Sequence, residues 1–378
     1  MRILEVLTHA EWGGRENMVV SLSQALARLG HDVTLACPDG TPMWRHAEAA
    51  GLDLLPFALP SKSFLLRDLW AMRRLLAPTR ADVAHVHDRA TYVSALHLLP
   101  GLRHPPMIYR VSGIRSLNSR RRFVFRHLPS PMVAVSRAVR DSLVADGVPP
   151  QHVVVIPNGL DVRAFQDEAG TREAARAEFG LDPDAPVVGG LGRLSPEKGF
   201  DDFLRAAQIV AQRHPQVQFL IVGDGPDRSS LERLAGQLGL TDRVVFTGYR
   251  ADVPRALRCM DLLLFTATWE EAFGIVLIQA GALGLPIVAT RSGASCEILV
   301  DGVTGLLVDK RAPAMAAAAV LELLDGAPRR REMGAAAAAR VREHYDISLT
   351  ARRWAELSEA VAAGRRPAWA TSEAQPCP

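Results

Sequence analysis

Short apolar runs alternate with longer segments of helical periodicity along most of the chain. Met18, Leu22, Leu26 and Leu29 recur at helical spacing, and 201–213 and 229–238 show similar helical patterns. Strands and helices that alternate predict an α/β protein whose parallel sheets are covered on both faces. The runs that we assign to strands lie at 3–7, 32–36, 81–87, 107–111, 132–135, 186–191, 219–222, 244–246, 261–265 and 286–289.

This alternation stops at a polar, Ala-rich and charged stretch near 160–185 and then restarts. We therefore expect an N-terminal domain over 1–163 and a C-terminal domain over 164–348, within the two or three domains that a length of 378 residues allows. The segment 364–378 is polar and rich in proline, and we expect it to be disordered.

The composition is ordinary for a soluble protein, with 48% hydrophobic and 22% charged residues. The sequence contains no apolar window of about 18 residues, so we expect no membrane-spanning helix. The first residues do not resemble a secretory signal. The four cysteines lie far apart in the sequence, at Cys37, Cys259, Cys296 and Cys377. They do not have the spacing of metal ligands, and they are too few to form a disulfide scaffold. A reducing cytoplasm is the expected location.

The net charge of +3 is unevenly distributed. Residues 1–165 contain 20 basic and 13 acidic residues, which gives +7, and the remaining 24 basic and 28 acidic residues give −4. The positive charge of residues 1–165 favours an anionic partner or surface. A solvated surface with an uneven charge distribution explains the same excess equally well. A nucleic-acid partner is not expected, because that needs a basic stripe with aromatic side chains and only 6% of residues are aromatic.

Loops that follow the strands carry the candidate chemistry, because open parallel sheets bind ligands beyond the carboxyl ends of their strands. Gly13 and Gly14 follow the first strand and precede a helix, so backbone amides there can approach an anion closely. His87 ends the fourth strand candidate, with His85 deeper on the same face. A structural turn and packing histidines are the plainer interpretations of these two features.

The second half contains more specific signals. Arg193 and Lys198 share one short loop before a helix, an arrangement that suits a diphosphate and lacks the Walker A pattern. Glu271 precedes Phe273 and Gly274, which open an apolar helix with free amides near Ile275 and Val276. A carboxylate beside such a phosphate-binding helix end suits a sugar hydroxyl.

These motifs together resemble the retaining glycosyltransferases of family 4, the group 1 glycosyl transferases, over about residues 1–350. Gly13-Gly14 and HVHD lie where the family carries its N-terminal signatures. The order and spacing of the motifs carry the resemblance, and the further ones are VAVSRAVRDSL (133–143), PNGLD (157–161), GRLSPEKG (192–199), VGDGP (222–226), FTGY (246–249), EAFGIVLIQAGALGLPIVAT (271–290) and GVTGLLV (302–308).

The resemblance implies a GT-B fold, in which two Rossmann-like parallel-sheet domains face each other across a cleft, and a helix at 349–363 that packs back on the first domain. It implies a nucleoside diphosphate sugar as donor substrate, transfer with retention, and a glycan or lipid-linked acceptor in cell-envelope or lipopolysaccharide synthesis. No cofactor and no metal are expected, since no Asp-x-Asp site is evident.

The resemblance also implies roles for single residues. Arg193 and Lys198 would neutralise the leaving diphosphate, and Glu271 would bind hydroxyls of the transferred sugar. His87 would contact the donor sugar, and Gly13-Gly14 would approach the donor from the first domain. The remaining donor contacts would come from Tyr249 and Arg250 at the base, and from Phe273, Gly274, Ile275 and Val276 through backbone amides.

The chain departs from the family pattern at two places. Gln279 stands where the family has a second glutamate that holds the ribose hydroxyls, so this contact would lack charge assistance. YRVSG (109–113) replaces a common His-Gly pair on the acceptor side. A GT-B sugar-nucleotide epimerase and a noncatalytic nucleotide-sugar-binding protein stay open as alternatives.

The segment 113–127 combines arginines with apolar residues and predicts a peripheral contact with an anionic membrane or a charged acceptor. Pairing of these arginines with nearby carboxylates, or plain solvation, is the alternative. The arginines are Arg115, Arg120, Arg121, Arg122 and Arg126.

Overall fold

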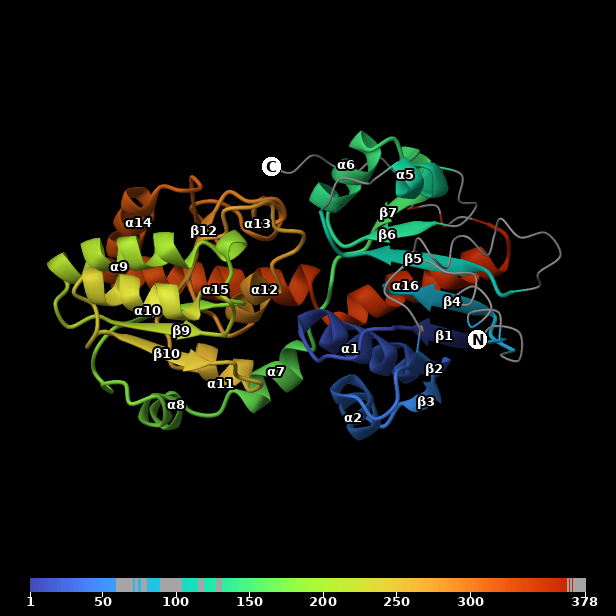
Figure 1. Ribbon diagram of the computed structural model, residues 1–378, viewed down its shortest axis with the longest axis horizontal. Helices are drawn as coiled ribbons and strands as arrows, with labels where there is room; N and C mark the ends of the chain where they lie inside the picture. The colour runs from blue at the N-terminus through green and yellow to red at the C-terminus, as the bar shows by residue number, and fades with distance from the viewer. Residues whose placement is uncertain are drawn as a thin grey trace. The chain divides into compact units, whose positions relative to one another are not determined.

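The computed structural model describes residues 1–58, 71, 74–75, 80–88, 104–114, 119–126, 131–365, 367 and 369. It contains two compact units (Figure 1). The N-terminal unit comprises Met1–Gly159 and the segment that starts at Ile347, and the C-terminal unit comprises Leu160–Asp346. Most of the tail expected to be disordered, 364–378, lies outside the described residues.

A seven-stranded sheet forms the N-terminal unit, in the order β3-β2-β1-β4-β5-β6-β7. All neighbouring strands are parallel. The strands are mostly buried apolar runs, as a parallel sheet covered on both faces requires. Their bounds are β1 (Arg2–Val6), β2 (Asp32–Cys37), β3 (Asp53–Pro56), β4 (Val83–Val86), β5 (Met107–Val111), β6 (Met132–Ala134) and β7 (Val153–Val155).

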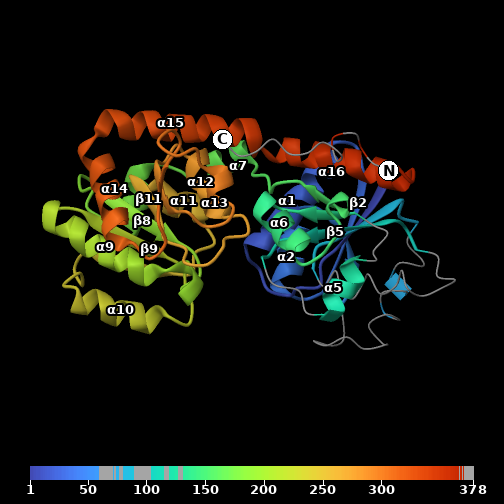
Figure 2. The ribbon, with the colours of Figure 1, turned by 90° about the horizontal axis from the view of Figure 1, so that it is seen from above.

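The last helix of the chain, α16 (Ile347–Ala362), belongs to this unit, where it contacts α1 (Gly14–Arg28) (Figure 2). Across the described part of the chain, no helix is both long and apolar enough to cross a bilayer. The unit's other described helices are α2 (Pro42–Ala49), α5 (Ser119–Arg126), α6 (Arg137–Ala145) and the short 3-10 helix η2 (Pro150–His152).

A buried polar cluster joins α16 to the sheet. Glu5 on β1 accepts hydrogen bonds from His85 Nδ1, at 2.9 Å, and from His87 Nε2. Ser358 Oγ donates to the Trp354 carbonyl at 2.6 Å, so it accepts from His85 Nε2 at 2.8 Å. Both nitrogens of His85 are therefore engaged, one by the Glu5 carboxylate of β1 and the other by Ser358 of α16.

The C-terminal unit contains a six-stranded parallel sheet in the order β10-β9-β8-β11-β12-β13. The two parallel sheets confirm the α/β class predicted from the sequence. The strands are β8 (Val187–Leu191), β9 (Gln218–Val222), β10 (Val244–Gly248), β11 (Leu262–Phe265), β12 (Ile287–Thr290) and β13 (Leu306–Val308).

Helices cover this second sheet. The apolar sides of α9, α10 and α14 pack with Val188, Phe219 and Leu264 of the strands into one core. The stretch near 160–185, which the sequence assigns to the junction, carries α7 and α8 within this unit. The helices are α7 (Val162–Glu168), α8 (Arg172–Glu178), α9 (Phe200–Arg213), α10 (Arg228–Gln237), α11 (Val253–Arg258), α12 (Ile275–Ala282), α13 (Ser295–Ile298), α14 (Pro313–Asp325) and α15 (Ala327–His344).

The turn between β8 and α9 requires a glycine at position 199. Gly199 has φ +65°, and a Cβ there would lie 2.1 Å from the Thr266 carbonyl oxygen of the loop after β11. Gly180 has the same φ, +65°, with nothing within 4 Å of its Cβ position. The two glycines therefore separate the effect of backbone strain from that of close packing.

We predict that Gly180→Ala lowers the free energy of unfolding of the C-terminal unit by about 1–2 kcal/mol, the strain of a left-handed L-residue. Gly199→Ala lowers it by about 2 kcal/mol more, because its methyl group must also displace a backbone carbonyl. Urea unfolding of both variants measures the difference. Equal losses would show that the two loops are not in close contact.

The Glu5 cluster predicts acid-dependent stability. Burial raises the pKa of Glu5, but His85 and His87 together outweigh it and lower the pKa to about 2. The folded pKa lies below the ordinary value of 4.5, so the stabilisation is complete above pH 4.5 and is lost as the pH falls toward 2.

We expect Glu5→Gln to destabilise the protein at pH 7 by about 3–5 kcal/mol, as removal of one partner of a buried ion pair does. The variant also loses part of the pH dependence between 4.5 and 2. Urea unfolding at several pH values measures both effects, with Glu48→Gln, a change at an exposed position of the same unit, as the control. An unchanged acid profile in Glu5→Gln would contradict the assignment.

Candidate functional site

In both sheets the strand order reverses, between β1 and β4 and between β8 and β11. At such a reversal the two following loops diverge and leave a crevice at the carboxyl edge of the sheet, where open α/β sheets bind ligands. In the C-terminal unit these loops run from Gly192 to Gly199 and from Thr266 to Gly274. They contain the three charged residues that the sequence assigns to catalysis in this unit, Arg193, Lys198 and Glu271.

Lys198 and Glu271 come from these two loops and meet as an ion pair, with Lys198 Nζ 2.5 Å from Glu271 Oε2. Their side chains are 26% and 16% exposed, so solvent-borne groups can still reach the pair. Two hydroxyls hold the loops together: Thr266 Oγ1 donates to the Lys198 carbonyl at 3.2 Å, and Thr268 Oγ1 donates to the Pro196 carbonyl at 3.0 Å. The sequence identified both charged residues but not their direct contact.

Arg193 lies at the start of the first loop and is exposed. Its guanidinium makes no hydrogen bond or ion pair with any residue that the structure describes. Burial raises the pKa of nearby Glu197, but a hydrogen bond from Ser195 and the charges of Lys198 and Arg193 lower it overall. The loop thus carries two cations: Lys198, which is paired with a carboxylate, and Arg193, which is available to bind an anion.

The helix α12 begins at Ile275, four residues after Glu271. Gly274, its N-cap, has φ +79° and lets the chain turn from the buried Phe273 into the helix. Ile275 and Val276 form the first turn, whose amides point toward the loop end of the helix. This arrangement places the positive end of a helix beside the Lys198–Glu271 pair.

Gln279 lies on the same helix and is only 7% exposed. Its carboxamide makes no hydrogen bond within the described part of the chain. The carboxamide atoms are not fully enclosed by protein, and the contact with ribose hydroxyls expected from the sequence stays a prediction.

Sequence reasoning missed the loop after β12, which holds Glu271 in place. Ser292 Oγ accepts from the Glu271 amide at 3.0 Å and donates to the Trp269 carbonyl. A Cβ on Gly293 would lie 2.3 Å from the Glu271 carbonyl oxygen. The available signal was a Ser-Gly pair directly after an apolar strand.

Tyr249 and Arg250 follow β10, in the same unit. Tyr249 is 62% exposed, whereas the Arg250 guanidinium pairs with Asp252 and Glu178 and lies 5.1 Å from the centre of the Phe179 ring. The Arg250 side chain is thus occupied by protein partners, and a base contact through the backbone stays a prediction.

The crevice of the N-terminal unit lies between the loops after β1 and β4. Asp88 joins them, because it accepts from the Thr8 amide at 3.0 Å and from Thr8 Oγ1 at 2.7 Å. Gly13 and Gly14 open α1 at this edge. The His87 ring is buried, with Nε2 in contact with Glu5 and Nδ1 without a hydrogen-bond partner. Its role at the donor stays a prediction.

Glu5, His85 and His87 are also the only group of potential metal ligands found among the described residues, with their ligand atoms within 4.8 Å of one another. The trio is fully buried, and both carboxylate oxygens already bind imidazole nitrogens. A structural ion pair explains the cluster without a metal.

Only part of the basic segment 113–127 can be placed. Arg122 on α5 pairs with Asp146 at 2.9 Å, which is the alternative that the sequence left open. Arg126 is exposed, and Phe123 is 58% exposed. Arg115 and the side chains of Arg120 and Arg121 lie outside the described residues.

Comparison with known proteins adds to this geometry. The sequence models of two families match the chain: Glycosyl transferases group 1 over residues 171–340, and Glycosyltransferase Family 4 over residues 12–164. A solved structure of Anabaena HepE in complex with UDP and glucose has a TM-score of 0.81 at 22% identity, and the match covers 94% of this chain and 98% of that one. This likeness shows that the two units have the GT-B fold.

Two curated relatives extend the comparison. The chain is 37% identical over 196 residues to a D-inositol 3-phosphate glycosyltransferase of Segniliparus rotundus, a match that covers 50% of this chain and less than half, 43%, of that protein. It is 30% identical over 318 residues to the lipopolysaccharide core biosynthesis mannosyltransferase LpsB of Rhizobium meliloti, covering 81% of this chain and 87% of that one. The chain therefore belongs to the group 1 glycosyl transferases, within glycosyltransferase family 4.

Proposed function

We propose that this protein is a retaining glycosyltransferase that moves a sugar from a nucleoside diphosphate sugar to a glycan or lipid-linked acceptor in cell-envelope synthesis. The observation that carries the proposal is the C-terminal crevice, where Lys198 pairs with Glu271, Arg193 lies on the same loop as Lys198, and α12 begins just after Glu271. Three positive groups suit a diphosphate, and one carboxylate suits the hydroxyls of a sugar.

In the proposed reaction the protein positions the substrates and stabilises charge, and none of its side chains forms a covalent bond to the sugar. Lys198 and Arg193 stabilise the negative charge that builds up on the leaving diphosphate, because fixed charges in a crevice act without reorganisation. Glu271 accepts hydrogen bonds from sugar hydroxyls and keeps the anomeric carbon beside the diphosphate. The leaving phosphate takes the acceptor proton on the same face, which retains the configuration.

The Lys198–Glu271 pair is the resting arrangement of this site. When a donor enters, Lys198 turns from the carboxylate to the diphosphate, and Glu271 turns to the sugar. Each charge leaves one partner for another, so neither has to be desolvated anew. The cations take the place of a metal ion, and we propose that the reaction is metal-independent.

The relatives support the class of donor and acceptor. The HepE structure holds UDP and glucose, and the names of the two relatives give an inositol phosphate and the lipopolysaccharide core as the settings of their reactions. The exposed Phe123, near Arg122 and Arg126 on α5, supports a peripheral contact with an anionic membrane on the acceptor side.

We predict that Arg193→Ala and Lys198→Ala each lower turnover by about 10²–10³-fold, the loss seen when one fixed donor to a developing charge is removed. Release of nucleoside diphosphate from a panel of UDP-, GDP- and ADP-sugars measures turnover. The assay is run with EDTA and again with added magnesium, and the parent protein should be equally active in both.

Lys310→Ala is the matched control, because Lys310 pairs with Glu270, the neighbour of Glu271. It removes a lysine–glutamate pair from the same loop without touching the proposed diphosphate contacts, and we expect near-normal turnover. Near-normal turnover in the double variant Arg193→Ala/Lys198→Ala would sink the proposal. Activity that depends on magnesium would remove metal independence alone.

Gln279→Glu should keep or tighten donor binding. The side chain has no hydrogen-bond partner among the described residues, so the change breaks no contact within the protein, and a carboxylate is the stronger acceptor for ribose hydroxyls. Calorimetric titration with the active nucleotide sugar gives the dissociation constant, and Gln237→Glu, at an exposed position of α10, is the control. Tenfold weaker binding in Gln279→Glu would rule out the ribose role.

A further inference from the structure

Arg110, the fourth residue of β5, is a buried arginine that no part of the proposed reaction uses. It is 6% exposed, and its Nη2 donates to Asn158 Oδ1 at 2.6 Å. Its Nη1 is fully buried without a hydrogen-bond partner. A guanidinium carries five N–H donors, so a single neutral amide oxygen leaves most of its capacity unused.

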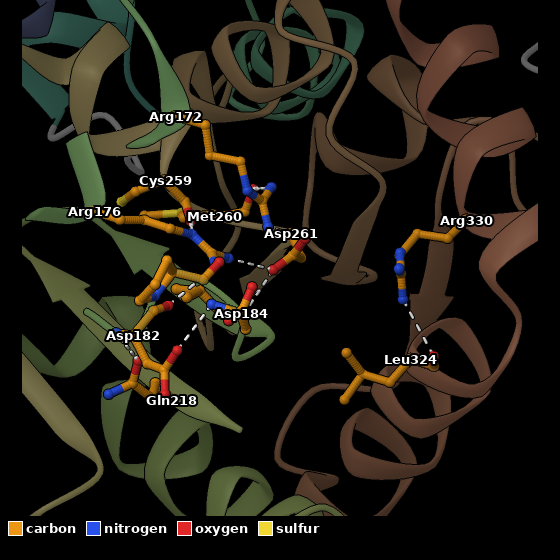
Figure 3. A network of polar contacts seen from close by, with 12 residues as sticks. Arg172, Arg176, Asp182, Asp184, Gln218, Cys259, Met260, Asp261, Leu324 and Arg330 are labelled. Atoms are coloured by element: carbon orange, nitrogen blue, oxygen red, sulfur yellow. Dashed lines mark hydrogen bonds and ion pairs between the residues drawn. The ribbon is translucent and has the colours of Figure 1, made fainter. Parts of the chain in front are cut away.

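The C-terminal unit shows how this fold satisfies a buried arginine when the role is structural. Arg176 on α8 is 2% exposed, and Figure 3 shows its guanidinium surrounded by acceptors. It donates to one carboxylate and three carbonyls: Asp261 Oδ2 at 2.8 Å, and the carbonyl oxygens of Cys259 at 3.2 Å, Asp182 at 3.1 Å and Pro183 at 2.5 Å. Among the residues that the structure describes, Arg110 donates to no carboxylate and no backbone carbonyl.

The carboxylates near Arg110 are already taken. Burial lowers the pKa of Arg110 to about 10, and repulsion from Arg15 adds to this effect, while attraction to Glu5 and Glu16 opposes it. Glu5 binds His85 and His87. Glu16 Oε1 accepts from Arg15 Nε at 2.9 Å and Nη2 at 2.8 Å. Both carboxylates thus already accept hydrogen bonds from other side chains, and neither accepts one from Arg110.

Strand register places this unmatched charge at the edge of the sheet where ligands bind. Val86 pairs with Tyr109, so Arg110 follows at the level of His87, beyond the carboxyl end of β4. The neighbouring α1 spans 15 residues and starts at this same edge, with Arg15 and Glu16 in its first turn. A buried cation that hydrogen-bonds no carboxylate and the positive end of a long helix therefore lie at the same edge of the sheet.

We propose that Arg110 and the N-terminus of α1 form an oxyanion-binding site in the N-terminal unit, and that it takes a phosphate or carboxylate group of the acceptor. The planar fork of an arginine suits both groups, since each offers two oxygens to parallel N–H donors. The assignment of the anion to the acceptor rests on the proposed transferase function. The site itself does not, because it can be tested by binding alone.

The test measures the binding of inorganic phosphate to the full-length protein, in an Arg193→Ala/Lys198→Ala background that removes the phosphate contacts expected in the other unit. Thermal unfolding and calorimetric titration are run at constant ionic strength with phosphate, acetate or chloride. We expect phosphate or acetate to raise the unfolding temperature above its value in chloride. Arg110→Gln should weaken that binding at least tenfold.

Arg2→Gln is the matched control, since it removes an arginine from the same unit that is already paired with Asp82. It should leave phosphate and acetate binding unchanged. Without added anion, Arg110→Gln should unfold at the same or a higher temperature, because it removes a buried charge that lacks a carboxylate. If Arg110→Gln does not fold, Arg110→Lys keeps the charge and loses the fork, and several-fold weaker binding is expected.

The outcomes distinguish a phosphate from a carboxylate as the bound group, and a failed anion site from a structural role of Arg110. Stronger binding of phosphate indicates a phosphorylated acceptor, and stronger binding of acetate indicates an acidic sugar. Equal protection by chloride, or an anion response that survives in Arg110→Gln, would overturn the site. A lower unfolding temperature with an unchanged anion response would make Arg110 structural. None of these results alters the nucleoside diphosphate release that tests the transferase.

Discussion

The parallel direction of the strands is the constraint on which the other features of each unit depend. Because all strands of a sheet run the same way, their following loops emerge at one edge, and the reversal of strand order opens a crevice there. The ends of α12 and α1 arrive at these edges with their positive poles. Charged side chains that are distant in sequence, such as Lys198 and Glu271, meet at this edge, where hydroxyls of neighbouring loops hold them in place.

The two crevices handle charge in different ways. In the C-terminal unit the ion pair is partly open to solvent, so its members can exchange partners when a ligand arrives. In the N-terminal unit the Glu5 cluster is closed, and its charges are matched within the protein. Arg110 lies beside that closed cluster without sharing its carboxylate. The charged side chains of the C-terminal crevice can therefore change partners when a ligand binds, while those of the N-terminal cluster keep a fixed arrangement.

The sequence predicted the strongest strands and the loop residues that follow them, because short apolar runs and glycine-rich turns are local signals. The class and the pair of parallel sheets followed from that alternation. It missed β3, β7 and β13, which are only three or four residues long and carry little periodicity. Arg193, Lys198 and Glu271 could be found because each stands beside a turn that local sequence reveals.

The contacts of these residues could not be predicted, because they depend on register and on loops far away in the chain. Glu5 sits inside the apolar run RILEV, and nothing nearby indicates that two histidines eighty residues later will face it. Ser292 holds Glu271 through a backbone contact that any polar residue after a strand could make. Arg122 was read as a basic surface residue, and a single aspartate on the next helical segment changes that interpretation.

The crossing of α16 back to the first unit has a consequence for synthesis on the ribosome. The C-terminal unit is continuous, from Leu160 to Asp346, so it can fold as soon as that stretch has emerged. The first unit is complete only when residues after Ile347 are released, since Ser358 meets His85 across 273 positions. Until then the nascent chain carries the Glu5 cluster without its covering helix. The first unit is therefore the first to be synthesised and the last to be completed, and a truncation that removes α16 would expose the Glu5 cluster of its sheet.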